Sequence, residues 1–281
     1  MADYNWKPIE PLSDKERRAD ITAMTPDADL NSRSEIEERV ARGQITWTGP
    51  VTLVVARTFL LMAAQAGLAG IFALQGRPSP WQAAAAWWTI YGTLADIGCL
   101  ALMAQFRRAE GIRFRDLLGS VRRRRDVIRG LGYYLIIFPC FLGGSILSSL
   151  AVYGSMGPKI PSGQLHDRVL PVWAVVYTLS VWWMIWSATE ETTYQAYALP
   201  RFEALCGRPW IAMTVVGFWW TLQHCALPFI ADWRYLVWRF FAFVPGVIVS
   251  MTIYRRTRRL APMIVAHWPM DIAAAIFTVR F

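Results

Sequence analysis

The chain has 281 residues, of which 55% are hydrophobic and 17% are charged. Soluble domains carry about 25% charged residues, so this composition argues against a water-soluble globular protein and favours a membrane protein. The net charge is +9. The cysteines form no CxxC pair, so neither a disulfide framework nor a thiolate metal site is indicated. No phosphate loop, GxGxxG or HExxH motif occurs, which argues against nucleotide-driven pumps and zincin proteases, while a transporter stays open.

The chain begins with a polar and acidic segment that does not read as a secretory signal, so we expect the N-terminus in the cytoplasm. Residues 1–49 are predicted to form a cytoplasmic arm with short amphipathic helices. Two pairs, Ser13 with Glu16 and Ser34 with Glu37, have the spacing of capping boxes. A partly disordered tail is the alternative.

Seven apolar runs follow, each long enough to cross a bilayer at about 1.5 Å per residue. They are residues 53–74, 81–105, 131–153, 170–199, 210–230, 236–254 and 262–279. The expected fold is all-α, a polytopic integral membrane bundle of about seven or eight transmembrane helices formed by residues 50–281. The fourth run is long and would have to tilt or extend beyond the bilayer.

Basic residues concentrate in two connections, residues 106–130 with nine arginines and residues 255–259 with four. Seven crossings from an inside N-terminus place both on the cytoplasmic side, as the positive-inside rule requires. The net charge is then explained by topology and by contact with anionic lipid, so we expect no nucleic-acid partner. The expected location is a bacterial cytoplasmic membrane.

Adjacent carboxylates, Glu190 and Glu191, interrupt the fourth apolar run. An ionisable group at membrane depth costs several kcal/mol unless it is paired or faces a wet cavity, so the pair is a candidate functional site. Successive side chains on a helix point about 100° apart, and the two carboxylates cannot both aim at one point. One is the expected catalyst and the other its support.

Two of the three histidines, His224 and His267, lie in other apolar runs. A single histidine in an apolar helix is more often a packing residue, but two of them together with carboxylates favour a site. His267 and Asp271 are spaced i, i+4 and share a helix face. In the first two runs, Arg57 and Asp96 are predicted to form a structural ion pair.

Three blocks in order carry a family resemblance: residues 190–195, Trp220 to His224, and His267 to Asp271. They resemble the EExxxR, FxxxH and HxxxN/D blocks of the type II CAAX prenyl endopeptidase and bacteriocin-processing family, also called CPBP or ABI proteins. The family-like core covers about residues 170–281. Trp220 in place of Phe keeps an aromatic wall, but Gln195 stands where the family has Arg.

The loss of that Arg leaves Glu191 without its expected cation, because a neutral amide cannot compensate a buried carboxylate as a guanidinium does. The sequence leaves two states open for Glu191. It is either protonated, or paired with a more distant base such as Arg201.

The resemblance implies an intramembrane protease that hydrolyses a peptide bond with a glutamate-activated water and without metal or other cofactor. Glu190 would be the general base on a water that His224 also holds. His267 would stabilise the oxyanion, and Asp271 would set the orientation of the His267 ring. The implied partners are the lipid bilayer and a membrane-associated peptide or protein, with or without a lipid anchor.

Alternatives remain open. Two histidines and one glutamate form a known zinc ligand set. The chain could also be a catalytically silent membrane scaffold or immunity protein, or an enzyme that acts on a lipid or isoprenoid. The expected entrance is at the cytoplasmic face, yet a count along straight helices from Pro200 places Glu190, His224 and His267 at different depths.

Overall fold

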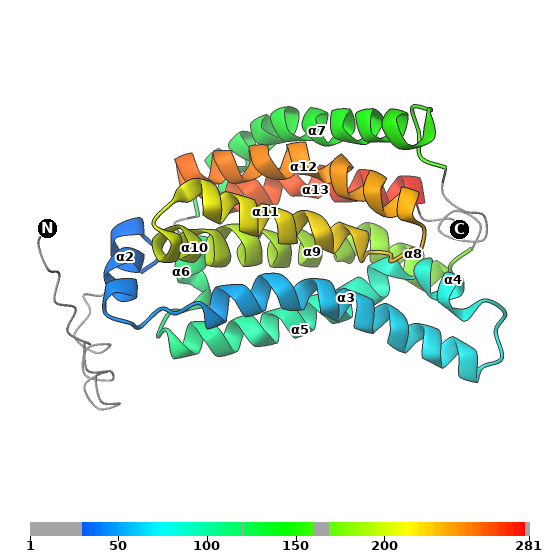
Figure 1. The fold of residues 1–281 in the computed structure, drawn as a ribbon, viewed down its shortest axis with the longest axis horizontal. Coiled ribbons are helices and arrows are strands. Elements are labelled where there is room, and N and C mark those ends of the chain that lie inside the picture. Colours follow the sequence, from blue (N-terminus) through cyan, green and yellow to red (C-terminus); the bar gives the residue numbers. More distant parts are fainter. Residues whose placement is uncertain (1–29, 120, 160–168, 279–281) are drawn as a thin grey trace, which may run out of the picture.

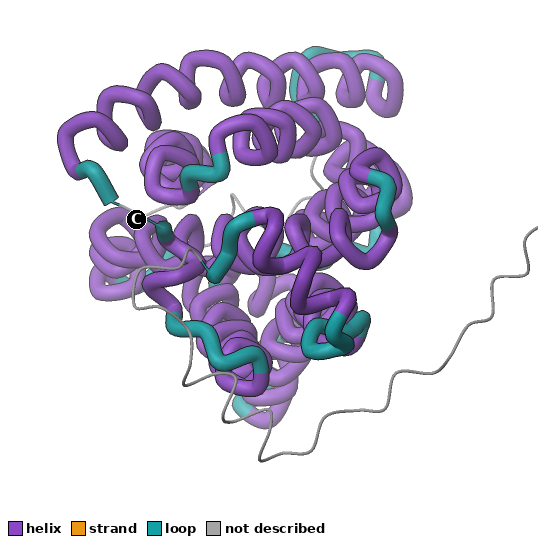
Figure 2. Tube along the Cα trace, turned by 90° about the vertical axis from the view of Figure 1, so that its left-hand side faces the viewer, coloured by secondary structure: helices purple, strands orange, loops and turns teal. Residues whose placement is uncertain are grey.

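The computed structural model describes residues 30–119, 121–159 and 169–278 as a bundle of helices, which run roughly along its long axis (Figure 1). Several of them are seen nearly end-on in Figure 2, while the uppermost helix runs obliquely across the view. The predicted all-α class is confirmed, and the described residues contain no strand; Ala226 and Phe229 form an isolated bridge. Six segments are long and apolar enough to cross a membrane, so the chain is a multi-pass integral membrane protein. They are Thr48–Leu74 (α3), Trp88–Ala109 (α5), Arg123–Tyr153 (α7), the composite Val172–Cys206, Trp233–Thr257 (α12) and Leu260–Thr278 (α13).

The remaining helices are shorter. They are α2 (Arg33–Ala41), α4 (Pro80–Ala85), α6 (Phe114–Leu118) and α11 (Pro209–Cys225). The run predicted at residues 210–230 corresponds to α11, which has 17 residues and stops at Cys225. Its length of about 25 Å lies at the lower limit for a bilayer crossing.

The N-terminal arm differs in detail from the sequence prediction. Helix α2 is present, but its N-cap is Ser32, whose side chain accepts a hydrogen bond from the Glu35 backbone N–H at 3.4 Å. The predicted capping box of Ser34 and Glu37 is therefore wrong by two residues, because the chain turns into the helix at the first serine. The predicted box of Ser13 and Glu16 lies outside the described residues.

The composite segment changes its helical type along its length. It runs through α8 (Val172–Tyr177), the π-helix η1 (Thr178–Trp182), α9 (Trp183–Glu191), the π-helix η2 (Thr192–Ala198) and α10 (Leu199–Cys206). π-Helical turns are rare and occur mostly at functional sites. One of them, η2, begins directly after the two adjacent carboxylates.

Local chemistry accounts for η2. Pro200 has no N–H, so it cannot donate to the carbonyl of Ala196 four residues earlier. Asn31, just before α2, donates to that carbonyl instead at 3.1 Å. At the other end, the hydroxyls of Thr192 and Thr193 donate back to carbonyls four residues earlier at 2.6 and 2.7 Å, which competes with regular α-helical bonding. A contact with the N-terminal segment thus supports the irregular turn.

Helix α7 packs closely on α12 and α13 through glycines. A Cβ atom added to Gly144 would lie 2.6 Å from the Ala242 carbonyl oxygen, and one added to Gly130 would lie 2.8 Å from that of Pro262. Small residues at these positions let the helix backbones approach. The adjacent Gly143, by contrast, has no such neighbour within 4 Å.

Candidate functional site

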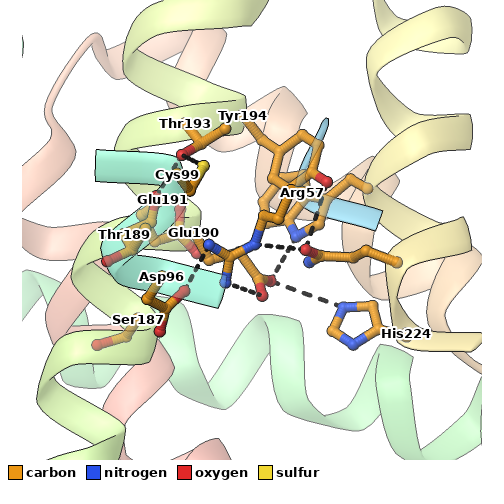
Figure 3. Close-up of polar contacts among 12 residues, drawn as sticks. Arg57, Asp96, Cys99, Ser187, Thr189, Glu190, Glu191, Thr193, Tyr194 and His224 are labelled. Atoms are coloured by element: carbon orange, nitrogen blue, oxygen red, sulfur yellow. Dashed lines mark hydrogen bonds and ion pairs between the residues drawn. The ribbon is translucent and has the colours of Figure 1, made fainter. Parts of the chain in front are cut away.

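The three sequence blocks meet at one oxygen atom of Glu190, which is 1% exposed near the end of α9. Trp220 of α11 donates its indole N–H to Glu190 Oε1 at 2.5 Å. The Nε2 atoms of His224 and His267 lie 3.6 and 4.0 Å from the same oxygen (Figure 3 shows the His224 contact). Two predicted histidines from two different helices therefore lie beside the predicted carboxylate.

Glu191 contacts the second histidine from the other side. Its Oε1 lies 2.9 Å from His267 Nδ1, while Asp271 Oδ1 lies 3.4 Å from His267 Nε2. The suggested pairing of Glu191 with Arg201 is wrong. Arg201 lies along α10 and binds Glu110 with its guanidinium, at 2.5 Å for the closest pair of atoms. The sequence alone could not predict that Glu110, just after α5, forms the ion pair with Arg201.

Both ring nitrogens of His267 thus face carboxylates, Glu191 at Nδ1 and Asp271 at Nε2. Only the doubly protonated ring has a donor on each nitrogen, so this arrangement favours the cation. The shorter contact is with Glu191. Glu191 is consequently the stronger constraint on the orientation of the ring, a role that the sequence interpretation had given to Asp271.

The predicted ion pair between Arg57 and Asp96 is present, with 2.6 Å between Nη1 and Oδ1, and both side chains are fully buried. Arg57 also makes two contacts that the sequence did not predict. Its Nη2 lies 3.8 Å from Glu190 Oε2 (Figure 3), and its Nε donates to the Gln223 side chain at 2.5 Å. A cation from the N-terminal half of the chain therefore lies beside the central carboxylate.

Gln195, at the position where the family has Arg, is fully buried in η2. Neither atom of its amide makes a hydrogen bond with the described residues. Gln195 thus gives no polar support to Glu191. Glu191 contacts His267 instead, and Arg57 of α3 supplies the guanidinium beside Glu190.

A cavity of about 150 Å³ opens beside these groups. Four of the five predicted site residues line it, and Glu191 does not. The remaining wall is mostly aromatic and includes Trp182, whose neighbour Trp183 packs against Trp268 instead. The residues that line the cavity are Trp88, Phe138, Phe141, Trp182, Trp186, Glu190, His224, Leu227, Arg239, Phe243, His267, Met270, Asp271 and Ala274.

The count along straight helices placed Glu190, His224 and His267 at different depths, but the structure brings the three side chains together. The count took Pro200 as the end of the fourth helix, but α10 continues to Cys206. Beyond Pro200, Glu203 still pairs with Arg255 and Arg258 at the end of α12. The helices therefore do not end at one common level, and Pro200 was the wrong residue from which to count the depths.

The side chains around Glu190 determine whether the site could hold a metal ion. Within residues 30–119, 121–159 and 169–278, no group of three His, Cys, Asp or Glu side chains is arranged to hold a metal ion. The groups at Glu190 instead include an indole N–H that occupies one of its oxygens. This donor set is suited to hydrogen bonding and proton transfer.

Comparison with known protein families adds an independent finding. Residues 171–273 match the family model described as Type II CAAX prenyl endopeptidase Rce1-like. The match contains both glutamates, both histidines and Asp271, and it leaves out Arg57 and Asp96. No curated protein and no solved structure matches the chain.

Proposed function

Because residues 171–273 carry a domain of the Rce1-like membrane endopeptidases, we propose that the chain hydrolyses a peptide bond within the membrane by a glutamate-activated water. The observation that carries this proposal is the meeting of His224 and His267 at one oxygen of Glu190, beside an aromatic cavity. Separations of 3.6 and 4.0 Å are too long for direct hydrogen bonds, and a water molecule can bridge such polar groups.

In the proposed mechanism, Glu190 takes a proton from the water while the His224 ring holds the water in place. The oxygen of the water bonds to the carbonyl carbon, and the carbonyl oxygen takes the negative charge. His267 donates from Nε2 to this oxyanion, with Glu191 holding the opposite side of the ring. The carbon–nitrogen bond then breaks, and Glu190 returns the proton to the leaving amine.

The orientation in the membrane is also a proposal. With the N-terminus in the cytoplasm, residues 1–49 form a cytoplasmic arm and residues 50–281 the membrane domain of a bacterial cytoplasmic membrane protein. The arginine-rich connections and α2 then lie on one side (left in Figure 1). The cavity includes Trp88, the first residue of α5, and Arg239, in the second turn of α12, so it lies toward the opposite end. We therefore expect access from that end or from the lipid.

The substrate class is tested by comparing cells that carry the wild-type protein with cells that carry Glu190→Gln. Mass spectrometry of peptides and lipids should reveal a peptide precursor that accumulates only with the variant. Accumulation of a lipid or isoprenoid with no change in any peptide would contradict proteolysis and favour the lipid-directed enzyme. Identical profiles would favour a silent scaffold or immunity protein.

The metal-free mechanism has its own test. The purified protein is expected to keep its full rate of peptide cleavage after exhaustive chelation and desalting, because the groups proposed for catalysis are proton donors and acceptors. Rates are measured before chelation, after it, and after addition of Zn²⁺. A loss on chelation that Zn²⁺ restores would show that Glu190, His224 and His267 act as metal ligands instead.

A further inference from the structure

One cation in the cavity wall has no function in the proposed chemistry. Arg239, in α12, is partly buried and lines the cavity together with Glu190, His224 and His267. Its Nε donates to the carbonyl of His224 at 3.1 Å and its Nη2 to that of Leu227 at 3.2 Å. A guanidinium has five N–H donors, so these two contacts leave others for a further partner.

Arg239 differs from three other arginines of the bundle in its ion pairing. Arg57 is paired with Asp96, Arg201 with Glu110, and Arg259 with Asp126. Among the ion pairs of the described residues, none joins Arg239 to a carboxylate. The Arg239 guanidinium also lies over two aromatic rings, 4.9 Å from the centre of Phe243 and 5.9 Å from that of Trp238. An arginine inside a membrane protein normally faces a counter-charge or a wet cavity, and a pathway or ligand is the usual reason.

The size of the cavity limits what can enter. Its volume of about 150 Å³ is below the roughly 300–1,000 Å³ of pockets that enclose drug-sized ligands. It suits a short peptide end better than the interior of a folded segment. A free C-terminal end always carries a carboxylate, which a guanidinium binds through two parallel hydrogen bonds.

Building on the proposed peptidase function, we infer that Arg239 is a substrate-binding residue that takes the free C-terminal carboxylate of the peptide. Glu190 and Arg239 line the same small cavity, so the cleaved bond lies close to the C-terminus and the leaving group is a short peptide. The depth of Arg239 agrees with this, because six residues from the start of α12 correspond to about 9 Å. The carboxylate would thus stay near the membrane surface while the cleaved bond reaches Glu190.

The test uses two versions of one synthetic peptide library of randomised sequence, with a C-terminal carboxylate or with a C-terminal carboxamide. We expect the wild-type protein in lipid nanodiscs to prefer the acid by about ten- to a hundredfold in kcat/KM, the range typical of a hydrogen bond to a charged group. Arg239→Gln should lower cleavage of the acid far more than that of the amide, so that the preference falls to about twofold. Arg239→Lys should keep part of the preference, because the charge remains while the two-pronged contact is lost.

Arg234→Gln is the matched control, since Arg234 lies on the same helix, is exposed and does not line the cavity. It should keep the wild-type preference. If Arg239 serves only to hold the end of α11 through its two carbonyl contacts, Arg239→Gln will slow both libraries equally. That result would overturn the inference.

A lipid phosphate offers the same chemistry as a carboxylate. Nanodiscs of phosphatidylcholine alone and with phosphatidylglycerol distinguish the two sources. Activity that rises with phosphatidylglycerol only when Arg239 is present, with equal cleavage of acid and amide, would assign Arg239 to a lipid and overturn the inference.

Binding separates this inference from the proposed function. Short acid and amide peptides are also titrated against Glu190→Gln, in which cleavage is blocked, with and without Arg239→Gln. If the wild-type protein cleaves neither library, the proposed peptidase function fails. An acid preference in binding that depends on Arg239 would still support the subsite, and equal binding of acid and amide would overturn it.

Discussion

Glu190→Gln is expected to lower kcat by at least about 10²–10⁴-fold, the usual contribution of a general base, with little change in KM. Glutamine keeps the size of the side chain, and its Oε1 can still accept the indole N–H that Trp220 donates to Glu190. It cannot take a proton from water. The measurement is the initial rate of peptide cleavage by the purified variant, together with its thermal unfolding in detergent.

Glu203→Gln is the matched control for this prediction. Glu203 lies on the same composite segment, but its carboxylate pairs with Arg255 and Arg258 and does not line the cavity. We expect this variant to cleave at close to the wild-type rate. Comparable rates for Glu190→Gln and the wild type would remove Glu190 from the mechanism.

Arg57→Met is expected to have the largest effect on stability, about 3–5 kcal/mol, the typical loss when one partner of a buried ion pair is removed. The variant leaves the fully buried Asp96 without its counter-charge and removes the shorter of the two hydrogen bonds that the Gln223 side chain accepts. Unfolding is followed by denaturant titration in detergent. A loss below about 1 kcal/mol would mean that the pair is not a structural anchor.

The double variant Arg57→Met with Asp96→Leu separates stability from activity. Replacement of both partners by apolar groups should restore most of the lost stability, because no buried charge stays uncompensated there. Cleavage should nevertheless remain slower than in the wild type, since the guanidinium 3.8 Å from Glu190 Oε2 is still missing. Asp96→Leu alone, which keeps Arg57, is the control for the loss of the carboxylate. Full activity of the double variant would confine Arg57 to a structural role.

Much of the architecture could be predicted because apolar length and polar spacing are local properties of the chain. The positions of the long helices and the pairing of Arg57 with Asp96 follow from them, and the resemblance gathered Glu190, His224 and His267 as one site. The structure contains six long apolar helical segments, the ion pair, and the contacts of both histidines with Glu190.

The remaining features depend on contacts between distant parts of the chain. The reach of Arg57 to Glu190 requires the relative rotation of α3 and α9, which no spacing specifies. Glu191 contacts a histidine rather than the guanidinium of Arg201, because a separate carboxylate, Glu110, pairs with Arg201. The irregular turn η2 likewise depends on Asn31, more than 150 residues away along the chain. A search for buried arginines opposite the carboxylates would have suggested the first of these contacts.

The turn η2 also sets the rotation of one part of the helix against another. A π-helical turn holds more residues than an α-helical turn, so the residues that follow it point in a different direction from those of an uninterrupted helix. On one side of η2, Glu190 faces the cavity, and on the other, Arg201 faces Glu110. A twist at the contact between Asn31 and Ala196 would therefore turn the carboxylates relative to the histidines, which links the alignment of the site to the seating of the N-terminal arm.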